Sequence, residues 1–91
     1  MNIFQTAYNK INELAEKNDS FIKAAWKSKD GKSYWFSIKM DKYKDSTSGN
    51  PEIACKAYEY DIETGKINEH QILDLINADL ADDEIDLSNI S

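Results

Sequence analysis

The feature that most constrains this chain is a pair of alternating apolar runs on either side of Asp30-Gly31, within residues 20–40. Alternation with a period of two is typical of β-strands, and glycine accepts the left-handed backbone that tight turns require. The pattern therefore predicts a β-hairpin, against which the rest of the chain must pack.

The length of the hairpin loop decides which side chains share a face. A two-residue loop at Asp30-Gly31 pairs Trp26 with Trp35 and mixes apolar with polar residues on each face. A three-residue loop, Lys29–Gly31, gives one clean apolar face through the pairs Trp26–Tyr34, Ala24–Phe36 and Ile22–Ile38. We predict the three-residue loop, because a slip of one residue would expose that whole face.

The flanking segments complete an α+β pattern. Residues 2–17 have apolar residues at helical spacing, and Asn2 and Gln5 occupy capping positions, so they predict an amphipathic helix. Residues 52–62 predict a third strand of ambiguous facing, with Ile53, Cys55 and Ala57 expected to point inward at its start. Residues 41–51 predict a polar loop, and residues 68–81 predict a second helix.

The predicted fold is a two-layer α-β-β-β-α arrangement. It has a three-stranded antiparallel meander, room for a short fourth strand at Lys66 and Ile67, and both helices packed on one face. We expect one α+β domain over residues 1–81 and an acidic C-terminal tail over residues 82–91. The length of 91 residues and the hydrophobic content of 41% are enough for one modest core.

Charge is distributed unevenly along the chain. Residues 1–60 hold ten lysines and eight acids, whereas residues 61–91 hold one lysine and nine acids, and there is no arginine. A net charge of −6 disfavours nucleic acid and anionic membranes as partners and favours basic surfaces.

Several classes of protein are disfavoured by the residues present. No apolar run approaches the roughly 20 residues of a membrane span, and the start lacks the pattern of a secretory signal. The single cysteine, Cys55, excludes an internal disulfide. We therefore expect a cytoplasmic protein without a cofactor or metal, of undetermined oligomeric state.

Two resemblances accompany this pattern. The predicted element order is similar to that of the double-stranded-RNA-binding domain, a family that contacts phosphates with lysines at the start of its last helix; the matching residues 68–71 contain no lysine. Residues 57–67, AYEYDIETGKI, resemble the strand–turn–strand signature of PepSY domains, which are associated with peptidase inhibition. Neither resemblance places a functional residue in this chain.

Candidate chemistry is sparse. His70 is the only histidine, and we expect it to be a solvated residue at a helix start rather than a general base. The acids near the C-terminus lack the glycine and distal glutamate of a calcium loop, so we expect a solvated acidic face. The protein is therefore expected not to be an enzyme.

The leading functional hypothesis is a small acidic protein-binding module that acts on a basic partner surface. Inhibitors, immunity proteins or antitoxins, and phage anti-defence proteins have this character. The candidate contact residues are acids: Asp74, Asp79, Asp82, Asp83, Glu84 and Asp86.

The alternative hypothesis is nucleic-acid or small-ligand binding through an exposed sheet face of lysines and aromatic residues. Its candidate residues are Lys23, Trp35, Lys39 and Tyr58.

Overall fold

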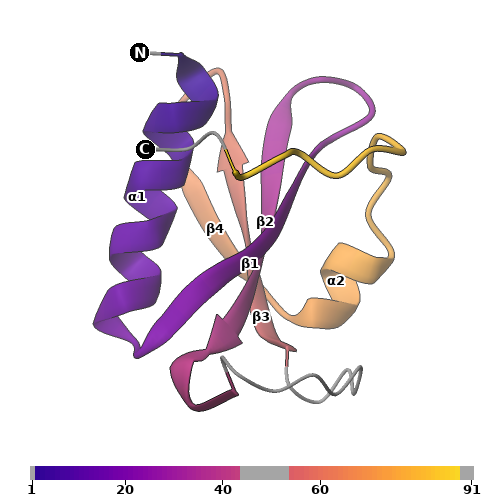
Figure 1. Ribbon diagram of the computed structural model, residues 1–91. Helices are drawn as coiled ribbons and strands as arrows, with labels where there is room; N and C mark the ends of the chain where they lie inside the picture. The colour runs from indigo at the N-terminus through magenta and orange to yellow at the C-terminus, as the bar shows by residue number, and fades with distance from the viewer. Residues whose placement is uncertain (1, 44–53, 89–91) are drawn as a thin grey trace.

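The computed structural model describes residues 2–43 and 54–88 and shows an α+β fold on one antiparallel sheet (Figure 1). The four strands lie in chain order: β1 (Ser20–Lys27), β2 (Ser33–Met40), β3 (Ala54–Asp61) and β4 (Ile67–His70). Helix α1 (Ile3–Lys17) precedes the sheet, helix α2 (Ile72–Ile76) follows it, and a 3-10 turn, η1 (Asp41–Tyr43), ends β2. The predicted α+β class and the short fourth strand are therefore confirmed.

Helix α1 begins and ends where its capping residues lie. The Oδ1 atom of Asn2 accepts a hydrogen bond from the backbone N–H of Gln5 at 2.7 Å, which satisfies one of the free donors of the first turn. At the other end, the side-chain amide of Asn18 donates to the carbonyl of Leu14 at 2.9 Å. Asp19 then turns the chain into β1 with a φ of +53°.

The hairpin loop contains four residues, 29–32, and the predicted three-residue loop is wrong. The backbone N–H of Ser28 donates to the carbonyl of Ser33 at 2.8 Å and closes the loop. Inside it, the Asp30 carboxylate accepts hydrogen bonds from the Ser28 hydroxyl at 2.7 Å and the Lys32 N–H at 2.9 Å. These polar contacts favour the longer loop, and Gly31 supplies its left-handed residue with a φ of +75°.

The register of the hairpin follows from this loop and from a bulge. Trp26 lies opposite Trp35, whereas Ile22 lies opposite Ile38, and the register shifts between them at Lys23. A β-bulge adds one residue to a strand and reverses the facing of the residues beyond it. Trp26 and Phe36 therefore point to opposite faces of the sheet.

Each face of the sheet has its own core. The α1-side core consists of residues from α1 and all three long strands: Ala7, Ile11, Ala15, Ile22, Ala25, Phe36, Ile38, Tyr58 and Tyr60. The α2-side core is smaller and consists of Trp35, Ala57 and Leu75, with partly buried Trp26, Ile72, Ala78 and Leu80.

The prediction that both helices cover one face is wrong. Adjacent residues of β2 and β3 belong to different cores, as Trp35 and Phe36 do, so both faces of the central strands are apolar and both need a cover. The helices lie on opposite sides of the sheet (Figure 1).

Strand β3 and the second helix differ from their predicted bounds. Residues 68–70, expected in the helix, extend β4 instead, and α2 has five residues. Ala57 points into the α2-side core, and its neighbour Tyr58 points into the α1-side core. The predictions for Ile53, for the Cys55 side chain and for most of the 41–51 loop lie outside the described residues.

Candidate interaction surface

Helix α2 presents apolar side chains to two sides. Leu75 is buried against the sheet, but Leu73 and Ile76 are 60% and 64% exposed. The helix is short, and its N-terminus is fixed by the Asp74 carboxylate, which accepts a hydrogen bond from the Gln71 N–H at 3.3 Å. The outer side of α2 is thus an apolar surface that nothing in the described chain covers.

A groove lies between α2 and β1 on this side of the molecule. It has a volume of about 550 Å³. Five apolar residues line it, Trp26, Leu75, Ile76, Ala78 and Leu80, together with charged Lys29, Asp79 and Asp82, and more than half of its exposed lining surface is polar. Lys29 and Asp79 approach to 4.0 Å with both side chains mostly exposed, so this ion pair contributes little stability.

The segment after α2, residues 79–87, forms a strap along the edge of β1. The N–H groups of Ala81 and Ile85 donate to carbonyls of β1, those of Lys27 and Ala25, at 2.9 and 2.8 Å. Leu80 packs in the α2-side core, whereas Ile85 and Leu87 pack in the α1-side core. The strap therefore has anchors on both faces of the sheet.

Three consecutive acids form the crest of the strap. Asp82, Asp83 and Glu84 are exposed and lie between the two backbone hydrogen bonds of Ala81 and Ile85. Because both ends of this stretch are held to β1 by backbone hydrogen bonds, the backbone that carries these three acids has a defined position on the surface. Beyond the crest, the Ser88 hydroxyl donates to Asp86 at 2.6 Å and holds the pKa of that carboxyl below its ordinary value.

His70 connects α2 with the sheet. Its ring lies 4.6 Å from the Trp35 ring, between centroids, with Nε2 3.1 Å from Glu59 Oε1 and Nδ1 3.4 Å from Asp74 Oδ2. The expectation of a solvated histidine at a helix start is wrong, because His70 ends β4 and its ring is partly buried. Both ring nitrogens lie near carboxylates, which fixes the orientation of the ring.

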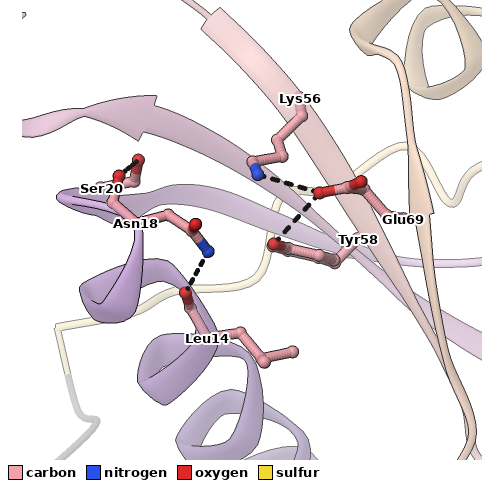
Figure 2. Close-up of polar contacts among 6 residues, drawn as sticks. All are labelled: Leu14, Asn18, Ser20, Lys56, Tyr58 and Glu69. Atoms are coloured by element: carbon pink, nitrogen blue, oxygen red, sulfur yellow. Dashed lines mark hydrogen bonds and ion pairs between the residues drawn. The ribbon is translucent and has the colours of Figure 1, made fainter.

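A second hollow, of about 550 Å³, lies on the opposite face near the end of α1. Figure 2 shows Lys56 and Tyr58 converging on one oxygen of Glu69, at 2.9 and 3.4 Å. The hydrogen bond from Lys56 lowers the pKa of Glu69, and the same bond raises the pKa of Lys56. Lys56 and Glu69, which are both part of the lining of this hollow, are thus paired with each other.

The structure places the predicted acids around the groove and the strap. Asp74 lies on α2, Asp79 and Asp82 line the groove, Asp83 and Glu84 continue the crest, and Asp86 follows it. All six are exposed, but they do not share one face, because Asp86 lies between Ile85 and Leu87, which pack in the α1-side core.

The alternative site does not exist as the predicted exposed face. Trp35 is 8% exposed under α2, Lys39 is buried, and Tyr58 is buried in the core on the opposite face from Trp35. Only Lys23, at the bulge, is exposed among these four residues. The physical reason is the second core, which covers the face that was expected to be wet.

Sequence reasoning missed the exposed apolar pair, Leu73 and Ile76, because every apolar residue of the second helix was assigned to the core. The signal was present. At about 100° per residue, the apolar residues at positions 72, 73, 75 and 76 span an arc of about 160°, which is wider than the stripe of about 100° that a helix needs to face a core.

The described residues contain no group of three or more histidine, cysteine or acidic side chains placed to hold a metal ion. Within the same part of the chain, no helix has the length and apolar content needed to cross a membrane. Comparisons of the chain with protein-family models, with curated proteins and with solved structures give no match.

Proposed function

We propose that the protein is a non-enzymatic binding module that docks on a basic surface of another protein. The docking surface is formed by α2 and the strap, residues 72–76 and 79–87, and is called the α2–strap side below. The observation that carries this proposal is the exposure of Leu73 and Ile76 beside the acids of the groove and crest. Apolar patches rimmed by polar residues are typical of protein interaction sites.

Electrostatics supports a basic partner. Residues 61–91, which build α2 and the strap, hold one lysine and nine acids. A surface of one sign accelerates encounter with a partner of the opposite sign and discriminates against others. The crest adds to this, because its backbone is already held to β1 at both ends and loses less conformational freedom on binding.

A small inhibitor of the immunity, antitoxin or anti-defence kind fits these properties. In such a role the acids would occupy a basic surface that otherwise holds nucleic acid, and the exposed apolar residues would supply the dry centre of the contact. The proposed module is cytoplasmic and needs no cofactor.

The test is affinity capture from the native host, with the crest neutralised in a variant carrying Asp82→Asn, Asp83→Asn and Glu84→Gln. A matched control neutralises three exposed acids elsewhere: Glu13→Gln, Glu16→Gln and Glu63→Gln. We expect the partner to be lost with the crest variant, retained with the control, and released as salt rises. Capture that is equal for both variants, or indifferent to salt, refutes the proposal.

A further inference from the structure

We infer that the groove between α2 and β1 receives an apolar anchor side chain from a basic amphipathic helix of the partner, an inference that rests on the proposed function. The groove is the place on the α2–strap side where a depression and exposed apolar side chains coincide. Amphipathic helices bind in such grooves through side chains spaced three or four residues apart.

Part of the groove offers apolar contact to an anchor side chain. Half-buried Trp26 and buried Leu75 contribute apolar surface, and Ala78 takes little room beside them. Leu73 and Ile76 are three residues apart on α2, so they lie on one side of the helix and form a ridge beside the depression. A helix that lays one side chain into the groove would rest its neighbouring apolar residues on this ridge.

The charges around the groove favour a partner helix of positive net charge. Asp79 and Asp82 belong to its lining, whereas the carboxylate of Asp74 is turned toward the Gln71 N–H and the His70 ring. Lys29 approaches Asp79 only loosely, at 4.0 Å, so an incoming lysine or arginine can replace it at little cost. Cationic residues on either side of the anchor would therefore meet carboxylates.

The same charges argue against a second copy of this chain as the occupant. Two α2–strap sides facing each other would bring two sets of acids together, and like charges across an interface oppose association. The groove is thus suited to a foreign helix of opposite charge rather than to self-association.

The experiment uses the full chain and three synthetic peptides of about 14 residues, long enough for roughly four helical turns. The first has an apolar leucine stripe and a lysine face, the second keeps the lysines but has alanine in the stripe, and the third keeps the leucines but has glutamate in place of lysine. Affinity is measured by calorimetry, and the indole N–H signal of Trp26 in ¹H–¹⁵N spectra reports on the groove.

We expect the leucine–lysine peptide to bind and to shift the Trp26 signal, with the alanine peptide at least about tenfold weaker and the glutamate peptide without binding. Ile76→Ser and Leu73→Ser should each weaken binding by about tenfold. The control is Ile3→Ser, an isoleucine 51% exposed on α1, which should change affinity less than about twofold.

Two outcomes overturn different statements. Equal binding of the alanine and leucine peptides, or no effect of both ridge substitutions, overturns the anchor inference and leaves the acidic docking side intact. No binding of either lysine peptide, or equal binding of the glutamate peptide, overturns the proposed function and the inference together.

Discussion

Replacement of Trp35 by alanine tests the two-sided sheet directly. Trp35 is 8% exposed and lies between Leu75, Ala57 and the His70 ring. A buried tryptophan removes about 200 Å² from water, an upper limit of about 5 kcal/mol at 25 cal/mol per Å². Truncations of this kind cost about 3–5 kcal/mol, so we expect a loss in that range for Trp35→Ala.

The assay is urea unfolding followed by far-ultraviolet circular dichroism, since the substitution removes a fluorophore. With a slope of about 1–3 kcal/mol per molar urea, the midpoint should fall by about 2 M. A domain of this size is stable by only about 5–15 kcal/mol, so Trp35→Ala could leave too little folded protein to measure. Trp35→Phe is therefore the second variant, and we expect a smaller loss of stability in the same direction.

The control for this experiment is Lys23→Ala, an exposed position on β1, which should cost less than about 0.5 kcal/mol. If Trp35→Ala also costs less than about 1 kcal/mol, Trp35 does not lie beneath α2, and the arrangement of a core on each face is refuted.

Other substitutions probe single features. Gly31→Val places a β-branched residue at a φ of +75° and should cost about 1–2 kcal/mol in thermal unfolding, with no loss if the loop is not left-handed there. Asn2→Ala removes the cap of α1 and should cost about 1 kcal/mol in urea unfolding, with Asn2→Asp nearly neutral. Ile85→Ser should cost about 1–2 kcal/mol by calorimetry, and an unchanged melting temperature would show that the strap is not packed. Because the pKa of Glu69 is lowered in the folded state, its pair with Lys56 stabilises the fold at pH values above the ordinary carboxyl pKa, and this stabilisation is lost as the pH falls through the lowered pKa. Glu69→Gln should therefore weaken the dependence of stability on pH in acid, by less than about 1 kcal/mol. An unchanged dependence of stability on acidic pH would count against the pair.

The elements of this fold were predictable from local patterns, but their facing was not. Helix α1 has its cap at Asn2 and its stripe in the sequence, and both strands of the hairpin alternate as strands do. The bulge at Lys23 leaves no such mark, because a lysine there is compatible with a regular strand. One extra residue moved Trp26 to the other face and with it the position of the second helix.

The candidate site was predictable in its charge and not in its shape. The acids of residues 61–91 follow directly from composition. The groove depends on α2 ending at Ile76 and on Leu80 returning to the sheet, and both follow from packing between distant parts of the chain. Burial of Trp35 likewise depends on the cover that α2 provides, which no local pattern encodes.

The strap ties the two sides of the molecule together mechanically. Leu80 packs on one side of the sheet and Ile85 on the other, so restraint of the acids between them is transmitted to both cores. A ligand that holds these acids should therefore slow amide exchange in α1 as well as in α2, although α1 lies across the sheet from the groove. In this protein, binding of a ligand to the strap would therefore be detectable as slower amide exchange in α1.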